Sequence, residues 1–114
     1  VFGSCGSMSG GVDISKFPNK WKIDQRIGKY ETNKQAWAEH AVINLVPTLK
    51  AGQNIIIDDG YSDFFYEVNC NLHKALLDAK IPHDFTIRPG AHTWEYWTNA
   101  IDYQMLFFAK AFAK

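Results

Sequence analysis

The feature that most constrains the fold is the run Asn54-Ile55-Ile56-Ile57-Asp58, in which three β-branched residues follow one another without alternation. β-branched side chains favour extended backbone, and a strand with only one face in a core alternates apolar and polar residues. A continuous apolar run of strand length is typical of a parallel strand buried on both faces. We therefore predict an α/β fold, with a mostly parallel sheet covered by helices.

The segments after this strand predict a helix, a second strand and a second helix. Residues 64–79 and 94–114 both place apolar side chains at spacings of three and four. Residues 83–87 form a short extended run that Pro89-Gly90 ends. This order, with long connections, predicts right-handed crossovers between parallel strands. The stripe predicted to be buried on the last helix consists of Trp97, Ile101, Met105, Phe108 and Phe112.

The first part of the chain is less regular. Residues 1–5 are expected to form a short strand or its end, and residues 6–11 a glycine-rich loop. A long irregular excursion follows, and long excursions in compact domains are often functional. Asn33 is predicted to cap a helix over residues 34–39. Since so small a parallel sheet covers its faces poorly, residues 1–114 are interpreted as one partial domain.

Composition excludes several classes of protein. Lys and Arg together number 12, as do Asp and Glu, so the chain has no basic footprint for nucleic acid and no basic cluster for an anionic membrane. No apolar run is long enough to span a membrane. The chain opens with Val1-Phe2-Gly3 rather than methionine, so we expect its natural N-terminus to be missing. Cellular compartment and homo-oligomeric state are left open.

Two loops are expected beyond the carboxyl ends of the predicted strands, where open parallel sheets place their chemistry. Residues 58–64 supply carboxylates, and residues 88–94 supply an imidazole. Neighbouring parallel strands lie roughly 5 Å apart, so these loops can meet. An acid that orients a histidine is the second half of a nucleophile–base–acid relay. The order Asp63 then His92 matches the chain order of the α/β-hydrolases.

Simpler interpretations exist for both residues. Asp63 precedes a helix, where aspartate caps the first turn, and His92 stands in a glycine-containing turn where polar residues are common. The remaining histidines are predicted at helix surfaces or strand edges. No pair of His, Cys or carboxylate residues has metal-ligand spacing, so we predict neither a metal nor a cofactor.

The sequence offers no convincing serine nucleophile. A nucleophile elbow needs glycine two places before and two places after the serine, and it leads into a helix. Ser9 has Ser7 at the earlier place, and the residues after Gly11 are poor helix formers. We therefore interpret residues 7–11 as a strand-end loop that lines the site.

Three segments together resemble a family of α/β-hydrolase esterases. This family includes esterase D, S-formylglutathione hydrolase, tributyrin esterases and bacterial feruloyl and acetyl-xylan esterases. The resemblance covers nearly all of the chain and is carried by residues 2–11, by the Asp-x-Gly-x-x-Asp-x-Phe pattern of residues 58–65, and by the Gly-x-His-x-Trp pattern of residues 90–94. It implies the C-terminal half of such an enzyme.

The resemblance implies Asp63 as the triad acid and His92 as the general base. Asp58 or Asp59 would support the pair or, alternatively, act as the acid itself. Trp94 would stand near the acyl or alcohol pocket, or else belong to the first buried turn of the last helix. The serine and the oxyanion hole would lie upstream, in a missing N-terminal half that is the expected partner. The substrate would be a small-molecule ester or an acylated carbohydrate, and the isolated chain is expected to be inactive.

Two other functions are compatible with the sequence. The chain could be a non-catalytic binding or assembly module that docks on a separate partner chain, which its 15% aromatic content also fits. It could instead be a carbohydrate-binding domain that uses exposed Trp37, Trp94 and Trp97.

Overall fold

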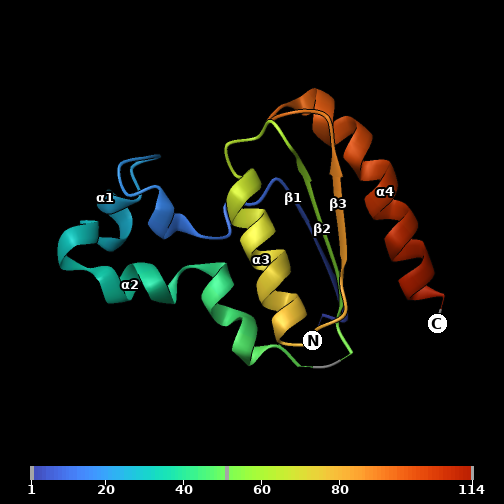
Figure 1. Ribbon diagram of the computed structural model, residues 1–114, viewed down its shortest axis with the longest axis horizontal. Helices are drawn as coiled ribbons and strands as arrows, with labels where there is room; N and C mark the ends of the chain where they lie inside the picture. The colour runs from blue at the N-terminus through green and yellow to red at the C-terminus, as the bar shows by residue number, and fades with distance from the viewer. Residues whose placement is uncertain (1, 51, 114) are drawn as a thin grey trace.

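The computed structural model describes residues 2–50 and 52–113, so the predicted ends Val1 and Lys114 lie outside the described residues. Three parallel strands form one sheet in the order β1 (Ser4–Met8), β2 (Asn54–Gly60) and β3 (Asp84–Arg88). Met8 pairs with Asp58, and Gly60 pairs with Arg88. All three strands therefore end at the same edge of the sheet (Figure 1).

The central strand behaves as its sequence predicts. All residues from Ile55 to Gly60 are buried, because β2 has a neighbouring strand on each side and a helix over each face. Helix α3 (Tyr66–Asp78) covers one face of the sheet and helix α4 (Trp94–Phe112) covers the other (Figure 1). The predicted α/β fold with a parallel sheet and flanking helices is confirmed.

Helix α3 begins two residues after its predicted start and ends one residue before its predicted end. Val68, Leu72 and Leu76 from its predicted stripe are buried against Ile57 and the excursion. Burying one such side chain contributes roughly 1.5–3 kcal/mol. This side of the sheet therefore holds the hydrophobic core.

The predicted buried face of α4 is wrong by one position. Tyr96, Ala100 and Gln104 face the sheet, whereas Ile101 and Met105 are exposed. Small and hydrogen-bonding side chains are needed there, because the amide Nε2 of Gln104 donates to the carbonyl of Ser7 in β1 at 3.0 Å. Of the other predicted residues, Trp97 and Phe108 are partly buried, with Phe108 close to Gly6 of β1, and Phe112 is exposed.

Strand β1 extends through residues that were predicted as loop. Gly6 pairs with Ile56 in the parallel ladder, and a Cβ placed on Gly6 would lie 1.9 Å from Oε1 of Gln104. Glycine weakens strand propensity, yet here it lets helix α4 approach the sheet closely. The glycine was thus a sign of close packing rather than of a turn.

The excursion of residues 12–50 forms short helices that extend away from the sheet beyond α3 (Figure 1). Trp37 anchors it, since its side chain is fully buried and its Nε1 donates to the carbonyl of Gly28 at 2.8 Å. Helix α2 has its predicted bounds, but Asn33 makes no capping bond and donates to the carbonyl of Lys29 instead. The helices are η1 (Ile14–Lys16), α1 (Asp24–Ile27), η2 (Tyr30–Thr32), α2 (Lys34–Glu39) and η3 (Val42–Thr48).

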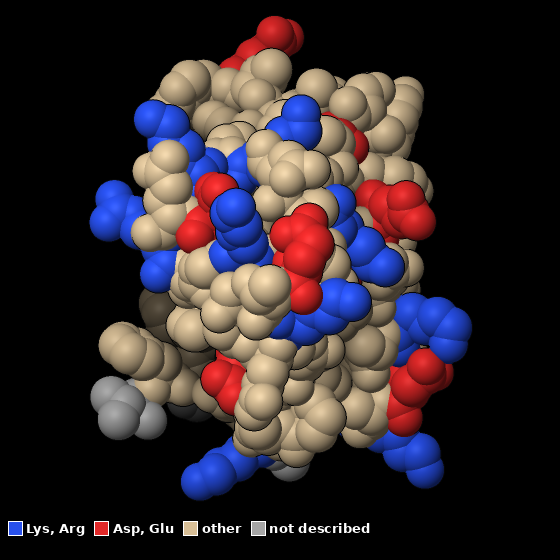
Figure 2. Space-filling view, turned by 90° about the vertical axis from the view of Figure 1, so that its left-hand side faces the viewer, with Lys and Arg blue, Asp and Glu red and all other residues tan. Residues whose placement is uncertain are grey.

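The surface over this excursion carries both signs of charge. Lys and Arg side chains intermingle with Asp and Glu side chains across the visible face (Figure 2). Interspersed charges of this kind give no extended field of one sign. Among the described helices, none combines the length and the apolar character needed to cross a bilayer.

Candidate active site

Asp63 and His92 meet beyond the carboxyl ends of β2 and β3. Nδ1 of His92 lies 3.0 Å from Oδ2 of Asp63, and the Asp63 side chain is buried while 32% of the His92 side chain is exposed. Because a carboxylate only accepts hydrogen bonds, Nδ1 carries the proton and Nε2 is left with its lone pair. An imidazole held this way can take up a proton at Nε2 from a group on its exposed side.

The turn after β2 fixes the carboxylate. Oδ1 of Asp63 accepts from the backbone N–H of Phe65 at 2.7 Å, and the N–H of Asp63 donates to the carbonyl of Gly60 at 3.0 Å. One carboxylate oxygen thus serves the turn before α3 while the other faces His92. Asp63 does not cap the helix, because the N-cap of α3 is Phe65 and no side chain makes a capping bond there.

The two loops are tied together by backbone hydrogen bonds. The N–H of Tyr61 donates to the carbonyl of Arg88 at 3.1 Å, and the N–H of Ser62 donates to that of Gly90 at 2.9 Å. A Cβ on Gly60 would lie 2.3 Å from the carbonyl oxygen of Gly90, so this approach requires glycine. Gly90 itself has φ +142°, which other residues rarely adopt.

Aromatic rings surround the imidazole. The centroid of the His92 ring lies 4.6 Å from that of Phe64, 5.5 Å from that of Phe65 and 4.8 Å from that of Trp97. Contacts of this kind hold a ring in one orientation and exclude water from its flanks. Trp94, at the first position of α4, is 79% exposed and packs edge-on against Trp97 at 5.1 Å. It is therefore one ring removed from His92 and not a buried core residue.

Behind Asp63 lies a polar network, of which the sequence analysis named only Asp59. Asp59 is fully buried and accepts from the N–H of Gly60 at 2.9 Å and from Nδ2 of Asn69 at 3.0 Å. Burial raises the pKa of Asp59, and the negative charge of Asp63 raises it further, to about 7. Ser9 is also buried, and its Oγ accepts from Nε1 of Trp97 at 2.9 Å. Ser9 therefore points into the network and not toward an open cleft, which supports its interpretation as a lining residue.

These partners could not be recognised from local sequence. Ser9 and Trp97 are 88 positions apart, and the buried Asn69 looked like an ordinary polar position on a helix. The available signal was Asn69 itself, since it stands next to Val68 in the face of α3 that packs on the sheet. A polar side chain at such a position normally has a buried hydrogen-bond partner.

Asp58 belongs to a separate cluster on the α4 side of the sheet. Its Oδ2 lies 2.9 Å from Nη2 of Arg88, and its Oδ1 accepts from the hydroxyl of Tyr96. Burial raises the pKa of Tyr96, and its hydrogen bond to Asp58 raises it further. The Arg88 guanidinium also stacks on the ring of Tyr103 at 4.1 Å. Asp58 is thus committed to a structural ion pair, whereas Asp59 is held by Gly60 and Asn69.

The other predicted surface histidines differ from one another. His40 is exposed, whereas Nδ1 of His73 lies 2.7 Å from Nε2 of His83 near the opposite end of the sheet from His92. Across residues 2–50 and 52–113, no group of three or more His, Cys, Asp or Glu side chains is arranged to hold a metal ion.

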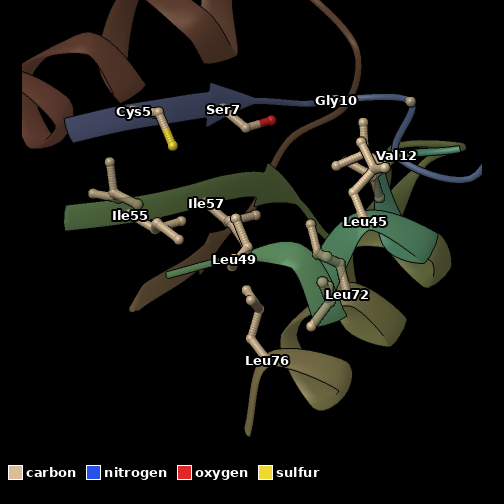
Figure 3. A pocket seen from close by; sticks show the side chains of 15 residues that line it. Cys5, Ser7, Gly10, Val12, Leu45, Leu49, Ile55, Ile57, Leu72 and Leu76 are labelled. Atoms are coloured by element: carbon tan, nitrogen blue, oxygen red, sulfur yellow. The ribbon is translucent and has the colours of Figure 1, made fainter. Parts of the chain in front are cut away.

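An apolar hollow lies on the face of the sheet that η3 and α3 cover. Its volume is about 370 Å³, and Cys5 and Ser7 of β1 form its rim opposite Leu45 and Leu49 (Figure 3). Ile55, Ile57, Leu72 and Leu76 line its base. The hollow is on the core side of β1, so it is separate from the exposed side of His92.

Solved structures place this arrangement among known folds, although no family model and no curated protein sequence matches the chain. A ferulic acid esterase is 26% identical, with a TM-score of 0.68 over 94% of this chain. The fluorophosphonate-binding serine hydrolase FphF of Staphylococcus aureus is 19% identical, with a TM-score of 0.69 over 93% of the chain. Dipeptidyl peptidase 4 of Porphyromonas gingivalis is 17% identical, with a TM-score of 0.76 over 95%.

The chain spans only part of these proteins, namely 40% of the esterase, 44% of FphF and 16% of the peptidase. The fold is shared with an esterase, a serine hydrolase and a peptidase, and the highest of these three identities is to the ferulic acid esterase. The expected resemblance is confirmed: this chain has the fold of the C-terminal part of an α/β-hydrolase and is similar to the esterases of that class.

Proposed function

We propose that the chain supplies the acid and the general base of a serine carboxylic-ester hydrolase, with Asp63 as the acid and His92 as the base. The observation that carries this proposal is the hydrogen bond of 3.0 Å between His92 Nδ1 and a buried Asp63 carboxylate, at the ends of neighbouring parallel strands. The likeness to serine hydrolases and esterases of known structure supports it.

In the proposed reaction, a serine oxygen attacks the ester carbonyl while Nε2 of His92 takes the serine proton. Asp63 keeps the imidazole in the Nδ1–H tautomer and stabilises the imidazolium that forms. His92 then protonates the leaving alcohol, and an acyl-enzyme remains. Next, His92 accepts a proton from water as the water attacks the acyl group, which releases the acid and restores the serine.

The serine is proposed to come from a segment other than the described residues. Within residues 2–50 and 52–113, no hydroxyl is hydrogen-bonded to Nε2 of His92, and the Ser9 hydroxyl is bonded within the network behind Asp63. The 114-residue chain alone is accordingly proposed to be inactive toward esters.

Strand β1 is the proposed docking edge for that nucleophile-bearing segment. It is paired on one side only, by β2, and an unpaired edge readily accepts another strand. The apolar hollow of about 370 Å³ opens beside this edge and would be covered by the added elements (Figure 3). The ferulic acid esterase and FphF are both more than twice as long as the part that this chain matches, which leaves room for such a segment.

Trp94 is proposed to border the acyl or alcohol group of the substrate. Its exposed ring extends the aromatic surface that begins at His92 and continues through Trp97. The substrate is proposed to be a small-molecule ester or an acylated carbohydrate.

The test is ester hydrolysis by the full gene product that carries this sequence, assayed with p-nitrophenyl acetate and butyrate. His92→Ala and Asp63→Asn are expected to lower kcat/KM by at least about 1,000-fold, as removal of triad members does elsewhere. Matched controls are His40→Ala and Asp78→Asn, which alter an exposed histidine and an exposed carboxylate far from the site. Activity within threefold of wild type in His92→Ala would contradict the proposal.

Labelling with a fluorophosphonate separates the two candidate functions. An ester hydrolase of the proposed type is labelled at one serine outside residues 2–113, and the isolated chain is not labelled. A gene product that is neither labelled nor active would favour the alternative, a binding or assembly module that uses the edge of β1. The carbohydrate-binding alternative loses support, because Trp37 is completely buried and cannot contact a ligand.

A further inference from the structure

We propose that Trp21 and Phe64 are specificity-determining residues, which bind a flat, uncharged ring in the alcohol part of the ester. This inference rests on the proposed function, because it takes His92 as the group that protonates the leaving alcohol. It adds a substrate class to that function, namely esters of alcohols that carry an aromatic ring. It also gives the excursion of residues 12–50 a part in the site.

A row of aromatic rings joins the excursion to the imidazole. The centroid of the Trp21 ring lies 5.7 Å from that of Phe64, which in turn lies 4.6 Å from that of His92. Phe65 makes a second connection, at 5.3 Å from Trp21 and 5.5 Å from His92. Trp21 is 55% exposed and Phe64 is 53% exposed, so this row presents aromatic surface to solvent beside the base. Aromatic walls of this kind are typical of small-molecule sites.

The backbone that carries Trp21 is strained. The N–H of Ile23 donates to the carbonyl of Lys20 at 3.3 Å, which closes a turn with Trp21 and Lys22 at its central positions. Their φ values of 54° and 56° are those of a type I′ turn, in which glycine, asparagine and aspartate predominate. A bulky residue with such a φ is unusual, and strain of this kind is concentrated at ligand-binding sites. The turn thus holds the indole against Phe64 in spite of the strain.

A hollow of about 340 Å³ opens beside these rings. Phe17 and Phe64, which both contact Trp21, form part of its wall. Lys16 and Glu67 also line it, and because their charges are opposite, the hollow favours neither an anion nor a cation. Cavities of a few hundred Å³ with apolar walls hold small ligands, so one uncharged ring fits this place.

The proposed reaction decides which part of the ester lies against these rings. Nε2 of His92 must come within hydrogen-bonding reach of the leaving oxygen in order to protonate it. The alcohol part of the ester begins at that oxygen, whereas the acyl part stays bound to the serine, which is proposed to come from another segment. The alcohol is therefore the part that is held closest to His92 and to the neighbouring ring of Phe64.

The test is hydrolysis of two matched pairs of esters by the full gene product, followed by pH-stat titration of the acid released. Benzyl acetate and cyclohexylmethyl acetate differ by a flat ring in the alcohol part, and methyl phenylacetate and methyl cyclohexylacetate differ by the same ring in the acyl part. Trp21→Gly is expected to raise KM for benzyl acetate about fivefold relative to cyclohexylmethyl acetate, with kcat unchanged, because the ring is bound equally before and during the reaction. The KM ratio of the acyl pair should change less than about twofold.

Glycine suits this turn because it adopts a positive φ without strain. Trp21→Gly therefore removes the ring while the backbone can keep the turn. Lys22→Gly is the matched control, since it relaxes the neighbouring position and keeps the indole, and its KM ratios should stay within about twofold of wild type. Trp21→Phe retains a flat ring and is expected to restore most of the preference for benzyl acetate.

Binding without turnover is measured with 4-phenyl-2-butanone, a ketone that has the shape of benzyl acetate and cannot be hydrolysed. It is titrated into ¹⁵N-labelled wild-type protein while the indole N–H signals are followed, and the Trp21 signal is identified by its loss in Trp21→Phe. That signal is expected to shift in a saturable way, and to shift much less with 4-cyclohexyl-2-butanone.

The outcomes separate this inference from the proposed function. Equal KM ratios in wild type and Trp21→Gly, in an enzyme that depends on His92, would overturn this inference alone. A larger effect of Trp21→Gly on methyl phenylacetate than on benzyl acetate would overturn the assignment to the alcohol part. A saturable shift of Trp21 in a protein whose hydrolysis does not depend on His92 would refute the proposed function and leave the ring-binding site.

Discussion

Asp58 and Arg88 form a buried ion pair between neighbouring strands, with 2.9 Å from Oδ2 to Nη2 and a fully buried Asp58 side chain. The contact joins the end of β2 to the end of β3, directly before the loops that carry Asp63 and His92. Tyr96 of α4 donates to the other oxygen of Asp58. The pair therefore fixes both loops and the start of α4 relative to one another.

Replacing Arg88 with methionine is expected to destabilise the protein by about 3–5 kcal/mol, because it leaves the Asp58 carboxylate buried without its counter-charge. The measurement is the urea midpoint at pH 7, with an unchanged m-value as the sign of a two-state comparison. Lys74→Met is the matched control, since it breaks an exposed ion pair with Asp78 and should cost at most about 0.5 kcal/mol. Equal effects of the two substitutions would contradict the structural role of the buried pair.

The parts of the fold that could be predicted correctly are those with a regular pattern of apolar residues in the sequence. The unbroken isoleucine run identified β2, and the spacing of Val68 and Leu72 identified α3. The buried face of α4 was missed because its contacts with β1 use Ala100 and Gln104, while Met105 is exposed. Hydrophobic periodicity finds the apolar face of a helix, and here that face differs from the one against the sheet.

Trp37 tests whether the excursion folds together with the sheet. Its side chain is fully buried and packs against Tyr30 with ring centroids 5.6 Å apart, so Trp37→Ala is expected to destabilise the protein by about 3–5 kcal/mol. Thermal unfolding followed by circular dichroism measures this. Trp21→Ala removes a ring that is 55% exposed and should cost less than half as much. If Trp37→Ala leaves the melting temperature unchanged, the excursion unfolds independently of the sheet.

The sequence could predict only the part of the site that follows from the order of its strands and helices. Asp63 and His92 follow consecutive strands, and parallel strands bring their carboxyl ends to one edge, so their meeting could be expected from the order of elements. The surroundings of Asp59 could not be predicted in this way, because they depend on Ser9 and Asn69, which come close to Asp59 only through tertiary packing. The pKa of a carboxyl group depends on such neighbours, and the residues next to it in the sequence do not reveal which ones they are.

The raised pKa of Asp59 predicts how stability depends on pH. In the unfolded chain the group loses its proton near its ordinary value of 3.8, whereas in the folded protein it keeps the proton up to about 7. Between these values the folded state binds more protons, so this group makes the free energy of unfolding decrease as the pH rises. The slope is at most about 1.4 kcal/mol per pH unit for one proton.

Urea midpoints of wild type and Asp59→Asn at pH 5 and pH 8 measure this contribution. Wild type is expected to lose stability relative to Asp59→Asn between the two values, because the asparagine cannot ionise. Asp78→Asn is the control, since Asp78 lies in an exposed ion pair and should show the same pH dependence as wild type. A wild type that gains stability relative to Asp59→Asn over this range would show that Asp59 is ionised in the folded state.

The His73–His83 pair allows a prediction of proton positions. Nδ1 of His83 lies 2.8 Å from the carbonyl oxygen of Ile81, which only accepts, so His83 carries its proton on Nδ1 and accepts at Nε2. Nδ1 of His73, at 2.7 Å from that Nε2, must then carry a proton as well. Long-range ¹⁵N correlation spectra at pH 8 should show both rings as Nδ1–H tautomers. Burial lowers the pKa of His73 and His83 lowers it further, so protonation favours the unfolded chain and stability should fall as the pH drops below the ordinary value of 6.5. An Nε2–H tautomer of His73 beside an Nδ1–H tautomer of His83 would place two lone pairs against each other and contradict this hydrogen bond, whereas Nε2–H tautomers in both rings would make His83 the donor and contradict its contact with Ile81.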